Sequence, residues 1–202
     1  MRYFKNIKNH YQKFDKFGNY FILTKKIERD LINENFDYEF ELKYSGLVEN
    51  VSYEENKEFI CLLDSAGEFI MSNSNAMLKI YKPYLDEFNG EVLISGMGLG
   101  VLILPLINDD TVTKIDIVEK DLDIINYVYT NRIKNLDISN KINVINDDIF
   151  TFTTTNNYDY ILLNHWVKPD DITLTEVSSL QSKFTNNLKE NGTIGTPILD
   201  FY

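Results

Sequence analysis

Three closely spaced glycines follow a short apolar segment near the middle of the chain. Residues 91–95 read Glu-Val-Leu-Ile-Ser and lead into Gly96, Gly98 and Gly100, after which residues 101–107 are apolar again. A short run of Val, Leu and Ile without polar alternation is typical of a strand that is buried on both faces. Glycines then allow a sharp turn and a close approach to the main chain. This stretch predicts a strand, a tight turn and a helix, with a nucleoside cofactor at the turn.

The spacing of the glycines separates two kinds of nucleoside cofactor. In the dinucleotide fingerprint Gly-x-Gly-x-x-Gly the third glycine would fall on Val101, where close packing of a helix on a strand favours Gly or Ala. NAD is therefore disfavoured. The pattern present, Gly-x-Gly-x-Gly, resembles motif I of the S-adenosylmethionine (SAM) dependent methyltransferases. The alternative is a glycine turn that only lets a helix pack on a strand.

Length and composition favour one main domain. A chain of 202 residues with 44% hydrophobic content can bury one sizeable core, but it is too short for two full domains and a linker. No apolar run approaches the ~18 to 20 residues of a membrane span, and residues 1–12 lack the apolar core of a signal peptide. We therefore expect no membrane association and a cytoplasmic location. The single cysteine, Cys61, lies in an apolar run and is expected to be buried, and no Cys or His cluster indicates a metal site.

The charge of the chain is acidic and unevenly distributed. The net charge is -11 and the pI is near 4.6, which argues against a broad nucleic-acid surface because phosphate contacts need clustered Lys and Arg. Residues 1–26, however, carry seven Lys and Arg side chains against one Asp. This basic arm could contact nucleic acid or an acidic partner, but we favour a solvated segment that compensates the acidic remainder.

Residues 1–73 predict an N-terminal arm followed by a small antiparallel β extension. Residues 1–19 are aromatic, basic and Asn-rich without a clear period, so we expect an arm or an oligomer contact there. A short helix is predicted at residues 26–36. Strands are predicted at residues 47–53, 58–63 and 68–71, with a turn at residues 64–67.

Residues 74–202 alternate between strand and helix patterns. A helix up to residue 88, kinked by Pro83, leads into this region. Strands are predicted at residues 91–95, 114–119, 141–145, 158–163 and, after a turn at 190–193, at 193–199, with helices at 101–107, 121–132 and 173–188. Pro197 places the last strand near an edge or a bulge. Repeated β-α units of this length build a parallel α/β sheet with helices on both faces, and ligands bind beyond the C-terminal strand ends.

Carboxylates stand at two of these strand ends. Glu119 ends the second strand and can accept hydrogen bonds from both hydroxyls of a ribose; a solvated loop acid is disfavoured by the apolar residues before it. Asp148 follows the third strand, where its oxygen can accept from an adenine amine while Ile149 packs on the base. The pair Asp147–Asp148 could instead cap a helix.

From residue 68 to residue 166 the chain resembles the spermidine synthase-like group of class I SAM-dependent methyltransferases, which includes bacteriophage-encoded members. The resemblance rests on residues 69–73 (Phe-Ile-Met-Ser-Asn), 92–100 (Val-Leu-Ile-Ser-Gly-Met-Gly-Leu-Gly), 117–121, 144–148 and 158–166. It implies a Rossmann-like methyltransferase fold behind a small antiparallel sheet, and a location in the host cytoplasm if the protein is viral. It also implies a SAM site built from Gly96, Gly98, Gly100, Glu119 and Asp148.

The chain departs from this group at two positions that bear on the reaction. Aminopropyltransferases of the group carry acidic residues at the positions of Leu99 and Asn164, and those acids would hold and deprotonate a polyamine. A neutral Leu and Asn cannot do so, which argues against aminopropyl transfer here.

The chain also ends after the fifth predicted strand, without the C-terminal hairpin of the usual seven-stranded sheet. The free edge could be covered by the N-terminal arm or by a second subunit in a homo-oligomer.

The segment Asn164-His165-Trp166 leaves the fourth predicted strand beside the glycine turn, so we expect it to border the methyl acceptor. Asn164 can orient an acceptor because its amide both donates and accepts hydrogen bonds. His165 could take a proton, although a lone histidine is more often structural, and Trp166 is equally consistent with a core aromatic and a stacking wall. The main hypothesis is methyl transfer to an unidentified small-molecule or macromolecular acceptor. The alternative is a non-catalytic viral structural or interaction protein that keeps the fold.

Overall fold

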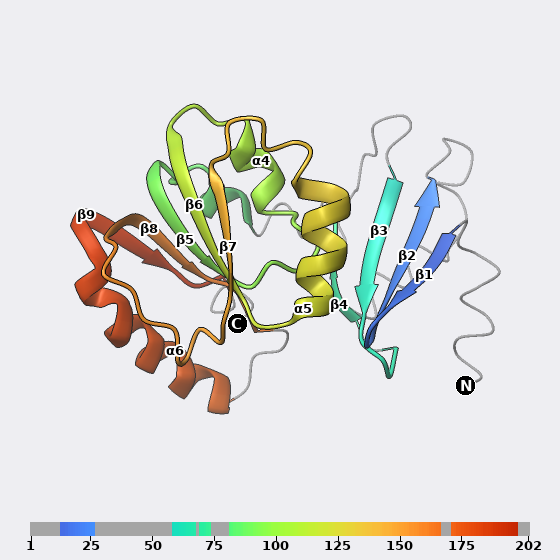
Figure 1. Ribbon diagram of the computed structural model, residues 1–202. Coiled ribbons are helices and arrows are strands. Elements are labelled where there is room, and N and C mark those ends of the chain that lie inside the picture. Colours follow the sequence, from blue (N-terminus) through green and yellow to red (C-terminus); the bar gives the residue numbers. More distant parts are fainter. Residues whose placement is uncertain (1–12, 27–57, 68, 74–80, 167–170, 198–202) are drawn as a thin grey trace. The chain divides into compact units, whose positions relative to one another are not determined.

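The computed structural model describes residues 13–26, 58–67, 69–73, 81–166 and 171–197. The chain divides into two compact units, residues 1–79 and 80–202 (Figure 1). The predicted helix at residues 26–36 and the predicted strand at 47–53 fall almost entirely outside the described residues. Within the described ranges, none of the helices has the length and apolar character needed to span a membrane.

The first unit contains an antiparallel sheet, as predicted, and this sheet has four strands. Its strands follow the chain in the order β1 (Lys13–Phe17), β2 (Tyr20–Lys26), β3 (Glu58–Leu63) and β4 (Phe69–Ser72). Ile22, Leu23, Cys61 and Leu62 are buried, so Cys61 takes the expected place, and burial raises the pKa of its thiol.

Residues 13–19, which we expected to belong to an ordered arm or an oligomer contact, form the strand β1 and a turn. The two-residue turn at Gly18 and Asn19 joins β1 to β2, and β2 pairs with β3 from Phe21 to Lys26. The short sequence of β1 has no clear period of two. Its strand conformation depends on pairing with β2, which in turn pairs with a strand more than thirty positions further along the chain.

The second unit is built on a five-stranded parallel sheet. Its strands are β5 (Gly90–Ser95), β6 (Val112–Glu119), β7 (Ile142–Asn146), β8 (Tyr158–Leu163) and β9 (Leu188–Gly195), in the spatial order β7-β6-β5-β8-β9. The chain moves outward from β5 to one edge and then returns to build the other edge from β8. This is the predicted Rossmann-like arrangement, with a topological switch point between β5 and β8.

The last strand corrects a predicted turn. We expected a turn at residues 190–193, but β9 already begins at Leu188. Asn191 has a φ of 65°, and the pairing of β8 with β9 shifts register across this stretch. Residues that favour a turn, Asn191 and Gly192, are therefore accommodated as an irregularity inside the strand.

The helices of the second unit lie on both faces of the sheet (Figure 1). They are α4 (Ile103–Ile107), α5 (Leu122–Ile124) with the π-helix η2 (Ile125–Ile133), and α6 (Asp171–Phe184) with the 3-10 helix η3 (Thr185–Asn187). Residues 81–85 are also helical. Asp121 caps α5, because its Oδ1 accepts from the Asp123 amide at 2.8 Å.

The face of the sheet that α6 covers holds the main core. Its buried members are Leu93, Val118, Ile149, Phe152, Tyr158, Ile161, Leu163, Leu180 and Phe184. They come from three strands, from the connection after β7 and from α6. The positions of the strand ends and of the loop that follows β7 are therefore fixed by one continuous apolar cluster.

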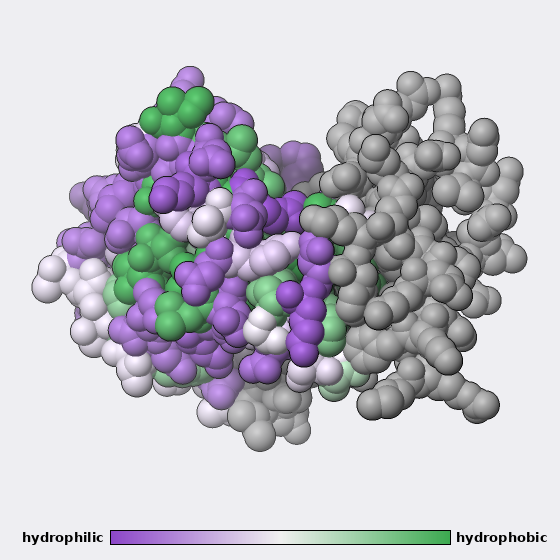
Figure 2. Space-filling view, turned by 45° about the vertical axis from the view of Figure 1, so that its right-hand side comes forward, coloured by the Kyte–Doolittle hydropathy of each residue, from purple (hydrophilic) through white to green (hydrophobic). Residues whose placement is uncertain are grey.

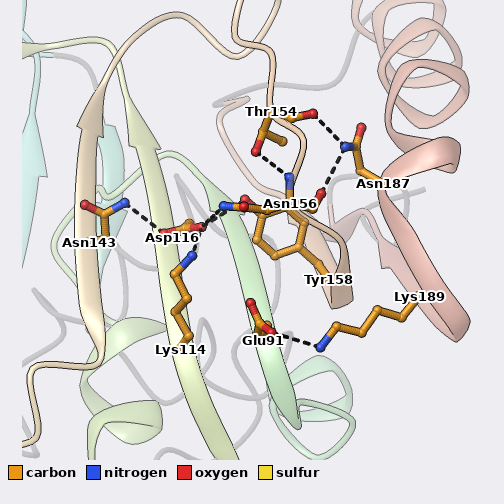
Figure 3. A network of polar contacts seen from close by, with 9 residues as sticks. All are labelled: Glu91, Lys114, Asp116, Asn143, Thr154, Asn156, Tyr158, Asn187 and Lys189. Carbon is orange, nitrogen blue, oxygen red and sulfur yellow. Dashed lines mark hydrogen bonds and ion pairs between the residues drawn. The ribbon is translucent and has the colours of Figure 1, made fainter.

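No helix stands between β7 and β8, and residues 147–157 instead cover a polar cluster around Asp116 (Figure 3). The fully buried Asp116 carboxylate accepts hydrogen bonds from Lys114 at 2.8 Å, Asn143 at 2.9 Å and the Tyr158 hydroxyl at 2.9 Å. Burial alone would raise the pKa of Asp116, but these donors outweigh it and the pKa is lowered. Burial and this carboxylate raise the pKa of Tyr158 to about 12.

Apolar groups reach the surface in small separate patches. Figure 2 shows a mainly hydrophilic face on the coloured part of the molecule, interrupted by limited hydrophobic areas. The large hydrophobic side chains that are most exposed among the described residues are Leu122, Leu136, Ile138, Phe150 and Leu174. Single exposed apolar side chains of this kind are ordinary on a folded protein.

Candidate functional site

The C-terminal ends of β5, β6, β7 and β8 bring the predicted site residues to one edge of the second unit. In the parallel ladders, Ser95 pairs with Val118 and with Leu163, and Glu119 pairs with Asn146. The glycine turn, the Glu119 carboxylate, the loop after β7 and the segment after β8 therefore all leave the same edge of the sheet. This is where an open α/β sheet binds its ligands.

The glycine turn has the backbone conformation that the sequence predicts. Gly96, Gly98 and Gly100 have φ values of 83°, 50° and 75°, a region that favours glycine. A Cβ on Gly96 would lie 2.9 Å from the Asn164 carbonyl oxygen, and one on Gly100 would lie 2.9 Å from Ile133 Cδ1. Gly96 and Gly100 are thus positions at which a side chain would clash with neighbouring protein atoms.

Glu119 is bound to the glycine turn through the main chain. Its Oε2 accepts from the Met97 amide at 2.8 Å and its Oε1 accepts from the Asp121 amide at 2.9 Å. The residue is only 9% exposed. Each carboxylate oxygen can accept a second hydrogen bond, so the side chain can hold the turn in shape and still accept from a hydroxyl pair.

Asp148 and Ile149 form a polar turn after β7. Asp148 Oδ1 accepts from the Phe150 amide at 3.0 Å, and the Asp148 carbonyl accepts from the Thr151 and Phe152 amides at 2.9 and 2.7 Å. Within the part of the chain that the structure describes, Asp148 Oδ2 and the Ile149 amide have no hydrogen-bond partner. An acceptor and a donor therefore stand side by side on adjacent residues.

The Ile149 side chain does not remain available to pack on a base. It is 4% exposed and belongs to the apolar core under α6. The neighbouring Phe150 is 39% exposed and was not predicted as a site residue. What Ile149 offers to a ligand is its main-chain amide.

Asn164 lies next to a tyrosine that the sequence did not single out. Its main-chain N–H donates to Ser95 Oγ at 2.9 Å. Its side-chain amide is hydrogen-bonded to Tyr81, which is 5% exposed. Burial raises the pKa of Tyr81, while the Asn164 hydrogen bond acts in the opposite direction. The neutral Tyr81 hydroxyl thus fixes the orientation of the Asn164 amide.

His165 is held by Ser95 and enclosed by aromatic rings. Its Nδ1 lies 2.8 Å from Ser95 Oγ, and its ring centre lies 3.8 Å from that of Trp166 and 5.4 Å from that of Phe150. Ser95 Oγ, which also accepts from the Asn164 main-chain N–H, can donate to or accept from His165 Nδ1. The other ring nitrogen, Nε2, is buried without a partner among the described residues.

The electrostatics of His165 oppose a role as a base. Burial, and to a smaller extent the positive charge of Lys120, lowers its pKa to about 4, while Asp148 acts in the opposite direction. At neutral pH the ring is uncharged, and one of its nitrogens is hydrogen-bonded to the hydroxyl of Ser95. The arrangement fits the structural interpretation of this histidine better than proton transfer.

The Trp166 side chain is hydrogen-bonded to a residue of α6. Its Nε1 donates to Glu176 Oε2 at 3.0 Å, and its ring packs partly buried against the core cluster. This contact supports the interpretation of Trp166 as a structural aromatic. Glu176 could not be inferred from the sequence, because nothing in its local pattern distinguishes it from a solvated helix residue.

The described residues contain no group of three or more His, Cys, Asp or Glu side chains that could hold a metal ion. The carboxylates of the site are instead bound to main-chain amides, as in Glu119 and Asp148. Leu99, at the position where aminopropyltransferases carry an acid, is fully buried.

Comparison with known proteins finds similar folds among solved structures. No protein-family model and no curated protein sequence matches the chain. DhpI in complex with S-adenosylhomocysteine (SAH) is 15% identical over 60% of this chain and 56% of its own, with a TM-score of 0.47. Coclaurine N-methyltransferase bound to N-methylheliamine and SAH is 23% identical over 59% of this chain and 34% of its own, with a TM-score of 0.45.

A further similar structure is the N-methyltransferase NodS from Bradyrhizobium japonicum WM9 in complex with SAH. It is 16% identical over 58% of this chain and 57% of its own, with a TM-score of 0.46. The chain thus spans about a third to three fifths of the length of these three proteins. The similar structures include SAM-dependent methyltransferases, and what this chain shares with them is the Rossmann-like unit.

Proposed function

We propose that the protein is a SAM-dependent methyltransferase. The observation that carries this proposal is that a free acceptor, Asp148 Oδ2, and a free donor, the Ile149 main-chain amide, stand on adjacent residues. They lie at the same sheet edge as Glu119 and the glycine turn. The edge of adenine offers an amine next to a ring nitrogen that accepts. The Glu119 carboxylate has remaining acceptor capacity for a ribose.

The residues near the end of β8 would orient the methyl acceptor. When bound, SAM supplies a methyl group on a positively charged sulfur, which a nucleophilic atom can attack directly. The Asn164 amide, held by Tyr81, can donate to or accept from an amine or hydroxyl. Catalysis by alignment needs no strong acid or base, which agrees with the neutral, hydrogen-bonded state of His165.

Ligand binding tests the proposal first. SAH or SAM at ~100 times its dissociation constant adds about 2.7 kcal/mol to the unfolding free energy, which corresponds to a rise in Tm of about 5 to 10 °C. NAD at the same concentration should leave the Tm unchanged. Stabilisation by NAD, with no response to SAH or SAM, would contradict the proposal.

Turnover is tested with labelled SAM. Cell extract is incubated with the protein and methyl-labelled SAM, and label is expected to pass to an acceptor in the extract. Asn164→Ala should retain SAM binding and lose this transfer. SAM that is bound but never consumed, in every extract tried, would favour a non-catalytic protein with a methyltransferase-like fold.

We further propose the finer features that the sequence suggests. The protein belongs to the spermidine synthase-like group, originates from a bacteriophage and acts in the cytoplasm. The methyl acceptor is not nucleic acid, unless the basic residues 1–26 bind nucleic acid. A homo-oligomer is also proposed, and light scattering after size-exclusion chromatography would test it.

A further inference from the structure

The connection between β7 and β8 is held in place by side chains from α6 and η3. Lys183 Nζ, near the end of α6, donates to the carbonyl oxygens of Ile149 at 3.0 Å and of Phe150 at 2.7 Å. Further along the connection, Asn187 Nδ2 donates to two more main-chain carbonyls at 3.0 Å each, as Figure 3 shows. These contacts stabilise a loop that contains no helix of its own.

Lys183 acts on the same peptide units that shape the polar turn. A peptide unit is planar, so fixing the Ile149 carbonyl also fixes the Phe150 amide in the same plane. That amide donates to Asp148 Oδ1 at 3.0 Å. A hydrogen bond from an ammonium to the carbonyl polarises this amide and strengthens the bond it donates. Lys183 therefore acts on the Asp148 carboxylate through one peptide unit.

The surroundings of Lys183 are apolar along α6 and acidic toward the loop after β7. It lies between the buried Leu180 and the buried Phe184 along α6 and is itself half-buried. Burial lowers the pKa of Lys183, while the negative charges of Asp147 and Asp148 act in the opposite direction. The side chain thus links a rigid helix to the loop that carries the free acceptor and donor.

We propose that Lys183 is a positioning residue that sets the selectivity of the site for a 6-amino purine over a 6-oxo purine. This inference rests on the proposed function, because it concerns how the base of the cofactor is recognised. Lys183 itself does not touch the base. It keeps Asp148 Oδ2 and the Ile149 amide at a fixed separation and orientation.

The chemistry of the two bases explains the selectivity. Adenine presents an amine donor beside a ring acceptor, which complements a carboxylate oxygen beside an amide. A 6-oxo purine presents a carbonyl acceptor beside an N–H donor, so both contacts become mismatched. A rigid pair rejects the mismatched base strongly, because its polar groups would be left unpaired. A loosened pair can move away from the mismatch and rejects it less.

Binding of two matched ligands tests the inference. SAH and its inosine counterpart, S-inosylhomocysteine, are titrated calorimetrically into the parent protein, Lys183→Met and Lys183→Arg. The parent is expected to prefer SAH by about 100-fold or more. Lys183→Met should bind SAH about 10-fold more weakly, with little change for the inosine ligand. Lys183→Arg keeps the charge and the donors and should restore most of the preference.

Lys189→Met is the matched control. Lys189 is also a partly exposed lysine with two acceptors, Glu91 Oε1 at 3.1 Å and Asp159 Oδ2 at 2.8 Å. Its partners stand near the N-terminal ends of β5 and β8, at the opposite ends of these strands from the site. This variant should keep the parent preference. If Lys183→Met does not fold, Lys183→Gln gives the same comparison, because its shorter amide cannot hold both carbonyls.

The outcomes separate the inference from the proposed function. An equal loss for both ligands in Lys183→Met would show a general structural role and overturn the inference, as would a preference identical to that of the parent. In both cases SAH binding by the parent would leave the proposed function intact. A parent that binds neither ligand would refute the proposed function and the inference with it.

Discussion

Replacement of Glu119 by alanine tests the central contact of the site. The carboxylate accepts from the amides of Met97 and Asp121, and a hydrogen bond to a charged group contributes about 1.5 to 3 kcal/mol. The Met97 contact is buried, so its amide would lose its partner completely. The Asp121 contact is partly buried, and water can replace the acceptor. We therefore expect the free energy of unfolding to fall by about 2 to 4 kcal/mol.

Loss of the same carboxylate should also weaken cofactor binding. Two charge-assisted hydrogen bonds to ribose hydroxyls would disappear, which corresponds to roughly 10- to 100-fold in the dissociation constant for SAH. Glu119→Gln is the informative companion variant. Its carbonyl oxygen can accept from one amide, but its NH2 group then faces the other amide as a second donor. Its stability should lie between those of the parent and Glu119→Ala.

Urea denaturation and calorimetric titration with SAH measure the two effects separately. At an m-value of about 2 kcal/mol/M, the expected destabilisation lowers the urea midpoint by about 1 to 2 M. Parent-like stability of Glu119→Ala would refute the bridging role of the carboxylate. Parent-like SAH binding would refute its assignment to the ribose, whatever the stability.

Three further predictions concern stability. Gly96→Ala should lower the unfolding free energy by about 1 to 3 kcal/mol, measured in urea, because a side chain at a φ of 83° is strained and would press on Asn164. Tyr158→Phe should lower it by about 1 to 3 kcal/mol while leaving the SAH dissociation constant unchanged, because the buried Asp116 carboxylate loses one donor far from the site. Burial lowers the pKa of His165 to about 4, so between pH ~6.5 and 4 the unfolded chain binds more protons, and stability should fall by up to about 3 kcal/mol as the pH decreases. His165→Gln should remove that component from a pH series of urea titrations, and an unchanged slope would contradict the assignment.

The parallel sheet could be predicted from the sequence because its signals are local. Apolar runs such as residues 92–94 and 161–163 are continuous, since both faces of a central parallel strand are covered. The carboxylates Glu119 and Asp148 could be placed at one edge because the C-terminal ends of parallel strands lie together. The assignment of Glu119 and Asp148 to a cofactor stays a prediction until binding is measured.

Elements whose conformation depends on distant partners were missed. The hairpin of β1 and β2 exists because β2 pairs with β3, and the sequence of β1 alone shows no strand period. Asn191 and Gly192 form a turn in most contexts, but here they form an irregularity where β9 follows β8. In both cases the pairing partner, which the local sequence does not contain, decided the conformation.

The sequence by itself determined which residue types stand at the strand ends: three glycines after β5, a carboxylate after β6 and a polar turn after β7. Only the tertiary structure decided what each of them contacts. Glu119 is bound to the Met97 amide, Asn164 to Tyr81, and the Ile149 carbonyl to Lys183. The physical reason is that strand patterns arise from the periodicity of neighbouring residues, whereas hydrogen-bond partners are set by packing of segments that lie far apart in the chain.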